Sequence, residues 1–569
     1  MPDAMHSGPR AAVGGALVLA AAVAGCGSPG PAGPPPDRIY VNAKVWTGDA
    51  AAGETQAIAV SGDRIVAVGT DEAVGALADA GTEVIDLEGR RVVPGFNDAH
   101  WHLPARRTAD LVDAGTVQEV QRRLQAFAAT LGPDEWVTGR GWGPSDFPGN
   151  RAHRRYLDDI FPNRPVLLTD RDGHQSLANG RALALAKVTR GTPEPVNGRI
   201  GRDANGEPSG LLQESAASLV GRLIPPLTTE QVYQALLAEM NRAASFGLTS
   251  LQVASGVGGS GLEYQAYQRA LREGALKVRL RLGVPFVREV TDAQLAEFVA
   301  LRDQHRDGLL AYGIAKGMLD GTVDAHTAAM LDPYAGATDT GLPMWTQPDL
   351  DRVVAAYDKA GLQVELHAIG DRAIRMALDA YAEAARINGT TGRRHRVEHA
   401  EVPALADLPR FKALGVIAST QAMFASPDVI TLANYAPALG PERASRSNAF
   451  KLFDDAGAVQ AFGSDYPVFT MEVMRGIHAA VTRQMPDGTP EGGWYPDHRI
   501  SVEAAVRHFT RDAAYASFDE ANKGTLTAGK WADFVVLSED VFAIPPAQLA
   551  GVRAWLTVMG GRETFRARQ

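Results

Sequence analysis

The middle of the chain alternates short apolar runs with longer amphipathic segments. Eight runs rich in apolar or β-branched residues have the length of buried strands, at 92–100, 248–253, 278–284, 312–318, 362–368, 395–399, 415–420 and 459–465. From the second run onward, helix-like stretches such as LDRVVAAYDKAG (350–361) separate them. Eight alternating β and α units are typical of a (β/α)8 barrel. We therefore predict an α/β protein with a (β/α)8 TIM barrel over residues 94–526.

One connection of this pattern is far too long for a barrel loop. About 145 residues separate the first run from the second, whereas ordinary connections are a few residues long. The segments WVTGRGW and RPVLLTDRDGHQSLANG lie within it. We expect an inserted subdomain at about 104–245, after the first barrel strand.

Both ends of the folded region have sequence patterns that are typical of short β-strands joined by turns. Segments such as AIAVSGDRIVAVG follow Arg38 and carry turn signals, and FVVL and WLTVMGGRE return to the same pattern near the C-terminus. We expect residues 37–93 and 527–569 to form one small β-sandwich that flanks the barrel.

The first residues have the pattern of an export signal. Arg10 precedes an apolar run from Ala11 to Gly25, which is too short to span a bilayer and ends at Cys26. VAGC resembles a bacterial lipobox, so we expect residues 1–26 to be a lipoprotein-type signal with lipidation at Cys26. Residues 27–36, GSPGPAGPPP, form a Pro/Gly linker. The protein would then be exported and membrane-anchored through its N-terminal lipid; cleavage after Ala24, which would secrete a soluble protein, and a chance alanine-rich start remain alternatives.

The amino-acid composition limits which binding partners and which metal-ligating side chains are possible. The 569 residues include 56 Lys+Arg and 66 Asp+Glu, a net charge of -10, so we expect no nucleic-acid partner. Hydrophobic residues make up 45%, which indicates globular material. The single cysteine excludes an internal disulfide and a thiolate metal cage. Histidine and carboxylate side chains are left as the usual metal ligands.

Histidines recur where the predicted barrel strands end. His100 and His102 form a His-Trp-His motif at the end of the first run, and alternation along a strand places both imidazoles on the same side. His367 and His399 close the fifth and sixth runs, and Asp465 closes the eighth. Because barrel enzymes keep their chemistry at the C-terminal strand ends, this pattern predicts a metal site there.

The motifs around these residues resemble those of a known family. PGFNDAHWH is similar to the first-strand signature of the amidohydrolase superfamily, and further segments resemble amidohydrolase family 3, which includes N-substituted formamide deformylases. These segments are RDGHQSLANGRAL, GEPSGLLQE, AKGMLDGTVDAHTAA, ELHAIGDRAI, HRVEHAE and FGSDYPV. The resemblance runs from about Asp37 to the C-terminus and implies a metal-dependent barrel with a flanking β-sandwich. His326 departs from the family, which often has arginine there.

The resemblance also implies how the metals would be held. In binuclear members of the superfamily a lysine is carboxylated and bridges two metals, and Lys316, followed by Asp320-Gly321, matches the K-x-x-x-D-G segment. A plain lysine pairing with Asp320 or lying at the surface is the alternative. We expect two divalent ions, with zinc as the default, held by His100, His102 and Asp465 on one side, His367 and His399 on the other, and carboxylated Lys316 between them.

Further residues would serve catalysis or substrate binding. Metal ions would lower the pKa of water toward 7 to give hydroxide, and Asp465 would act as general base and then acid. His174, in Asp-Gly-His, resembles the substrate-facing histidine of the family; the alternative is a structural loop histidine. Trp101 and Trp142 are candidates for an apolar substrate wall or for core positions, and a supporting or structural role is expected for Glu398 and Asp371.

The leading hypothesis is a metal-dependent hydrolase of amide-type carbon–nitrogen bonds in N-formyl, N-acyl or cyclic amide compounds. The same site acting on esters, lactones or phosphoesters is a second hypothesis. A surface-anchored binding lipoprotein without turnover is a third. A small-molecule substrate is expected in the first two cases, and the sequence leaves a homodimer open.

Overall fold

The computed structural model describes residues 35–568, except 105, 113, 258, 260, 306, 307 and 390. Cys26 and the signal segment lie outside the described residues, as does the expected linker up to residue 34. No helix of the described part is both long and apolar enough to cross a membrane.

The barrel sheet contains eight strands, all paired in parallel, so the predicted (β/α)8 fold is confirmed. In chain order they are β8 (Phe96–Trp101), β15 (Leu248–Gly256), β16 (Arg279–Pro285), β17 (Leu310–Met318), β18 (Gln363–Ala368), β19 (Arg396–His399), β20 (Ile417–Gln421) and β21 (Val459–Gly463). A bridge between Trp101 and Tyr466 joins the first strand to the segment after the last. Gly463 makes this close approach possible, because a Cβ there would lie 2.5 Å from the backbone nitrogen of His100.

Helices cover the outside of the sheet. They include α6 (Thr229–Ser245), α7 (Leu262–Arg272), α8 (Asp292–Gln304), α9 (Gln347–Lys359), α10 (Asp371–Asn388), α11 (Leu408–Leu414), α14 (Phe450–Asp455), α15 (Val473–Thr482), α16 (Val502–His508) and α17 (Arg511–Ala516). In α10 the buried residues Ile374, Ala377, Tyr381 and Ala384 recur at helical spacing, and the helix ends at Gly389 in a left-handed conformation. These faces and the strand residues beneath them form one large hydrophobic core.

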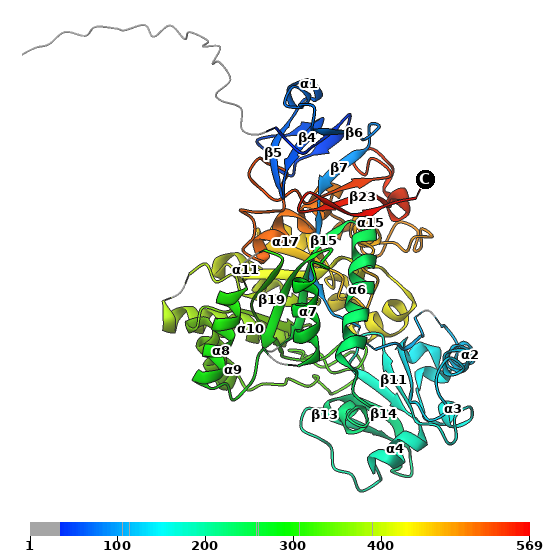
Figure 1. The fold of residues 1–569 in the computed structure, drawn as a ribbon. Coiled ribbons are helices and arrows are strands. Elements are labelled where there is room, and N and C mark those ends of the chain that lie inside the picture. Colours follow the sequence, from blue (N-terminus) through cyan, green and yellow to red (C-terminus); the bar gives the residue numbers. More distant parts are fainter. Residues whose placement is uncertain are drawn as a thin grey trace, which may run out of the picture. The chain divides into compact units, whose positions relative to one another are not determined.

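An inserted subdomain separates β8 from β15 (Figure 1). Its sheet has the order β13-β14-β12-β11-β10-β9, with strands β9 (Ala109–Asp110), β10 (Val137–Trp142), β11 (Val166–Asp170), β12 (Gln175–Ala178), β13 (Gly198–Arg202) and β14 (Pro208–Glu214). Helices α2 (Val117–Ala128), α3 (Arg155–Asp158), α4 (Gly180–Ala186) and α5 (Ser218–Gly221) accompany it. The sequence pattern assigned 229–245 to this insertion, but α6 buries Val232, Leu236 and Met240 in the barrel core.

The flanking domain joins the two ends of the described chain. One sheet, β5-β4-β1-β6, is built from β1 (Arg38–Val41), β4 (Ala57–Ser61), β5 (Arg64–Gly69) and β6 (Glu83–Asp86). The other, β24-β23-β22-β7-β2-β3, contains β2 (Lys44–Trp46), β3 (Glu54–Thr55), β7 (Arg91–Pro94), β22 (Phe534–Leu537), β23 (Ala554–Met559) and β24 (Arg562–Arg566). The early strand β7 pairs antiparallel with the late strand β22, and Figure 1 shows β7 and the late strand β23 in the same domain. Tyr40 and Phe534, from opposite ends of the chain, meet edge to face in the core between the sheets.

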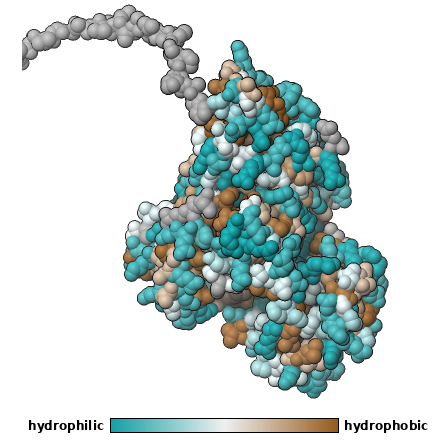
Figure 2. Space-filling view, viewed as in Figure 1, coloured by the Kyte–Doolittle hydropathy of each residue, from teal (hydrophilic) through white to brown (hydrophobic). Residues whose placement is uncertain are grey.

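The face of the molecule seen in Figure 2 carries mostly hydrophilic residues, with hydrophobic ones scattered among them. Such scattering is normal for a soluble surface.

Candidate metal centre

The carboxyl ends of five barrel strands bring the predicted ligands together. His100 lies in β8 and His102 directly follows it, Lys316 lies near the end of β17, and His367 and His399 lie at the ends of β18 and β19. Asp465 follows β21 with a positive φ of 54°. Because the strands are parallel, these side chains share one mouth of the barrel.

The carboxylate of Asp465 lies close to three imidazole rings. One of its oxygens lies 3.1 Å from His102 Nε2 and 3.4 Å from His100 Nε2, and the other lies 4.0 Å from His399 Nδ1. A tetrahedral zinc site with bonds near 2.1 Å has ligand atoms about 3.4 Å apart. The spacing of these side chains therefore suits a shared cation.

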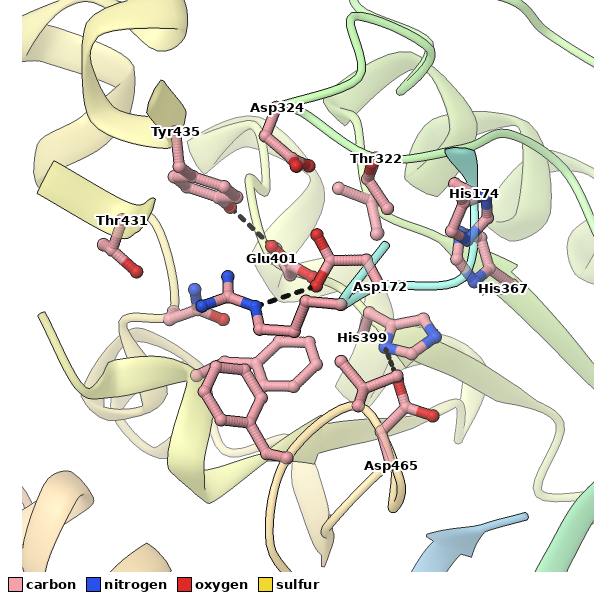
Figure 3. Close-up of a pocket in the computed structure, with 16 residues that line it drawn as sticks. Asp172, His174, Thr322, Asp324, His367, His399, Glu401, Thr431, Tyr435 and Asp465 are labelled. Atoms are coloured by element: carbon pink, nitrogen blue, oxygen red, sulfur yellow. Dashed lines mark hydrogen bonds and ion pairs between the residues drawn. The ribbon is translucent and has the colours of Figure 1, made fainter. Parts of the chain in front are cut away.

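His399 connects this group to a second pair of imidazoles. Its ring centroid lies 4.8 Å from that of His100 and 4.4 Å from that of His367. The ring of His174 follows at 5.1 Å from His367, and Figure 3 shows these two side by side at the edge of the pocket. All four belong to one row of rings across the barrel mouth.

Buried partners orient the ligands. Glu398 bonds Nδ1 of His100, which leaves Nε2 facing Asp465. Arg396 in turn donates to Glu398 at 2.8 Å and is itself fully buried. Nδ1 of His102 contacts the Ser255 hydroxyl at 2.9 Å. Such outer partners fix the ring orientation and tautomer of metal ligands.

The electrostatics of the cluster favour a bound cation. Burial lowers the pKa of His100 and His367 well below 6.5 and that of His399 to about 3, so these imidazoles are neutral at pH 7. Burial opposes the charge on Asp465, but the hydrogen bond from His102 and the nearby positive groups outweigh it and lower the pKa of this carboxyl. Neutral imidazoles and an ionised carboxylate are the forms that bind metals, and the donor atoms of His100, His399 and Asp465 lie within 4.8 Å of one another.

Lys316 lies against this group. Its Nζ is 3.3 Å from His100 Nε2 and 3.5 Å from Glu365, and its side chain is 7% exposed. Asp320 does not pair with it in the described structure: that carboxylate instead accepts the backbone N–H groups of Ile369, Gly370 and Ala329. An ammonium group cannot be a metal ligand, so Lys316 needs modification before it could serve as one.

His174 reaches the barrel mouth from the inserted subdomain, in the loop between β11 and β12. Its Nδ1 is 2.9 Å from Glu214, at the end of β14. Burial disfavours the charged imidazole, but attraction and hydrogen bonding from Glu214, with Asp170 and Asp172 nearby, raise the pKa of His174 to about 9. His174 is thus protonated at neutral pH and can donate a hydrogen bond.

A pocket lies between these rings and the loops above them (Figure 3). His174, His367, His399 and Asp465 line one side. Sequence reasoning missed the rest, which includes Arg171, Asp172, Asp324, Glu401, Phe424 and Tyr435. The Tyr435 hydroxyl donates to Glu401 at 2.6 Å. Arg171 and Asp172 lie in RDGHQSLANGRAL, Asp324 lies in AKGMLDGTVDAHTAA and Glu401 lies in HRVEHAE, so these segments could have flagged them. Phe424 and Tyr435 lie outside the quoted segments and have no local signal.

The two tryptophans proposed as a substrate wall do not reach this pocket. Trp101 is fully buried in the barrel core, because strand alternation turns it away from the side that holds His100 and His102. Trp142 is fully buried in the core of the insertion, edge to face with Phe147. Of the two alternatives that the sequence left open for each tryptophan, the structure shows the core position.

Asp371 and His326, which the sequence analysis also singled out, make contacts outside the metal centre. Asp371 accepts the backbone N–H of Leu331 at 2.7 Å, away from the imidazoles. His326, with a φ of 53°, stacks on Tyr334 with the ring centroids 4.3 Å apart. Neither side chain lines the pocket.

A (β/α)8 barrel with neutral imidazoles and a carboxylate at its C-terminal mouth defines a metal-dependent hydrolase. The chain belongs to the amidohydrolase family, whose model matches residues 83–565, as its motifs predicted. It is 32% identical over 521 residues to the Arabidopsis thaliana protein LONG AFTER FAR-RED 3, covering 89% of this chain and 88% of that protein. It is 29% identical over 547 residues to an N-substituted formamide deformylase of Arthrobacter pascens, covering 92% and 97%.

A solved structure shows the same fold. An uncharacterized metal-dependent hydrolase from Pyrococcus horikoshii OT3 superposes with a TM-score of 0.71 at 24% identity, over 90% of this chain and 99% of that one.

Proposed function

We propose that this protein hydrolyses amide-type carbon–nitrogen bonds in N-formyl, N-acyl or cyclic amide compounds, at a centre for two divalent metal ions. The contact of Asp465 with three imidazoles at the barrel mouth carries this proposal, because it places a carboxylate within 4.0 Å of three imidazole nitrogens. The similarity to a protein named for formamide deformylation supports the bond type.

Metal ions bound here would lower the pKa of a water molecule and polarise the scissile carbonyl. His100, His102, His367, His399 and Asp465 would hold them. Carboxylation of Lys316 would replace its positive charge with a negative one beside His100, which favours a second cation and supplies a bridging ligand.

Proton movement is assigned to Asp465. As the water oxygen adds to the carbonyl carbon, Asp465 takes the water proton, and it returns that proton to the nitrogen as the carbon–nitrogen bond breaks. Its depressed pKa keeps it ionised at the start of the cycle.

His174 is assigned to the carbonyl oxygen. It is protonated at neutral pH and lies beside His367 on the pocket wall, so it can donate a hydrogen bond as negative charge develops on that oxygen. Phe424 and Phe469, with ring centroids 5.0 Å apart, also line the pocket and give it an apolar surface for a substituent of the substrate.

A hydrolysis screen with metal-loaded, full-length protein tests the proposal. The substrates are N-formyl amines, N-acyl amino acids, lactones and phosphotriesters, and metal content is measured on the same samples. We expect about two ions per chain, turnover of a carbon–nitrogen substrate, and loss of that turnover in Asp465→Asn. Asp455→Asn is the matched control, since Asp455 is exposed and pairs only with Lys451 among the described contacts.

Turnover confined to lactones or phosphotriesters would refute the assigned bond type. A fully metallated protein that hydrolyses none of the four classes would favour the binding-protein alternative. Activity at a metal content near zero would remove the metal centre from the mechanism.

A further inference from the structure

A second cavity lies at the opposite end of the barrel. Arg281, Tyr312 and Gln363 line it, near the N-terminal ends of β16, β17 and β18. Tyr312 precedes Lys316 by four residues on the same strand, a separation of about 13 Å. The cavity has a volume of about 590 Å³, within the range of small-molecule sites, and takes no part in the metal centre.

The guanidinium of Arg281 is the distinctive group of this cavity. Its Nη1 donates to the backbone carbonyl of Ser517 at 2.7 Å, and its Nε is buried without a hydrogen-bond partner in the described structure. No carboxylate of the described residues forms a salt bridge with it. Burial lowers the pKa of Arg281 to about 10, which still leaves it positively charged at neutral pH.

Arg279, two residues earlier on the same strand, has the carboxylate partner that Arg281 lacks in the described structure. Its Nε and Nη2 bind the two oxygens of Asp533 at 2.6 and 2.9 Å. An enclosed cation costs free energy unless an anion or hydrogen bonds compensate it. Arg281 lacks the compensation that Arg279 has.

The remaining lining adds two paired guanidinium groups and aromatic side chains. Arg302 and Arg393 also line the cavity, where Arg302 pairs with Asp303 at 3.0 Å and Arg393 pairs with Asp358 at 3.2 Å. Asp519 is the acidic residue among the described lining, and it lies 3.5 Å from Lys523 Nζ. Phe518 and Trp531 supply aromatic surface. The cavity therefore combines the guanidinium of Arg281, which forms no salt bridge with the described residues, with room for a planar or apolar body.

We propose that this cavity binds a small organic anion, whose carboxylate or phosphoryl oxygens are held by Arg281 and whose body lies along the aromatic lining. Guanidinium groups match both kinds of oxyanion through paired N–H donors. The site is separate from the catalytic mouth, so its occupancy does not compete with hydrolysis and the proposal stands independently of the substrate.

The test measures the melting temperature of the full-length protein against increasing inorganic phosphate or benzoate, with chloride at equal ionic strength as reference. A ligand that binds only the folded state raises the melting temperature with concentration. We expect a saturating rise with at least one anion, confirmed by calorimetric titration. A response to phosphate alone assigns a phosphoryl ligand, and a response to benzoate alone assigns a carboxylate.

Arg281→Gln should weaken the binding at least tenfold. Arg181→Gln is the matched control, because Arg181 is exposed on α4 in the insertion, and it should bind as the wild type does. If Arg281→Gln does not fold, as judged by circular dichroism, Arg393→Gln provides the same comparison with a weaker expected loss.

The proposal is overturned if neither anion gives a saturable rise of the melting temperature in the wild type, which would mean that water alone fills the cavity. It is also overturned if the folded variants at Arg281 or Arg393 bind as tightly as the wild type.

Discussion

Replacing Glu214 with glutamine tests whether the charge on His174 is set by its buried partner. Glu214 Oε2 lies 2.9 Å from His174 Nδ1, and the two side chains are 6% and 10% exposed. Glu214→Gln keeps the size and the hydrogen-bond acceptor of the side chain but removes its negative charge. Burial then acts on His174 with much less opposition and lowers its pKa.

The size of the effect follows from the two pKa values. At a pKa of about 9, His174 is protonated roughly ten to one at pH 8. If the pKa returns to the ordinary 6.5, about one molecule in thirty is protonated at pH 8. If the imidazolium donates to the carbonyl oxygen, the variant should lose roughly 30-fold in kcat/KM at pH 8 but little at pH 5.5. A cation near His367 lowers the pKa of His174 in both proteins, so the difference between them is the quantity to measure.

The assay is a pH profile of kcat/KM from pH 5 to 10 for both proteins on the best substrate of the screen. The alkaline limb of the variant should move to lower pH. Glu207→Gln is the control, because Glu207 pairs with Arg190 at the surface of the same inserted subdomain. An unchanged alkaline limb in Glu214→Gln would refute either the electrostatic control by Glu214 or the use of the imidazolium.

Three further predictions concern the metal centre and the location of the protein. Asp465→Asn should lower kcat by about 10²–10⁴-fold, measured by initial rates at saturating substrate; a change of only a few-fold would remove its proton-transfer role. Lys316→Ala should abolish hydrolysis and be partly restored by short carboxylic acids that replace the bridging carboxylate, whereas an electron-density map of metallated protein with a plain Lys316 would contradict the carboxylation. Cys26→Ser should move the protein from the membrane to the soluble fraction with hydrolysis unchanged, as seen by fractionation and immunoblotting; wild-type protein that is soluble and begins at Gly25 would indicate ordinary cleavage instead.

The strand pattern and the chemistry at the strand ends could be predicted from the sequence. Eight apolar runs at barrel spacing correspond to the eight strands of the sheet, because a buried parallel strand needs apolar side chains on both faces. His100 and His102 share a side because alternate residues on a strand point the same way. The same rule applied to Trp101 would have placed it in the core, away from the site.

Contacts between segments far apart in the chain required the tertiary structure. The protonation of His174 depends on Glu214, 40 residues later and on another strand of the insertion. The contrast between Arg279 and Arg281 is equally invisible in the sequence, because only the packing shows that Arg279 pairs with Asp533 while no carboxylate of the described chain forms a salt bridge with Arg281. Local patterns determine which residues point together along one strand, but the partner of a buried charge depends on which loops the fold brings beside it. That is why the ligand-bearing strand ends could be predicted and the charges around them could not.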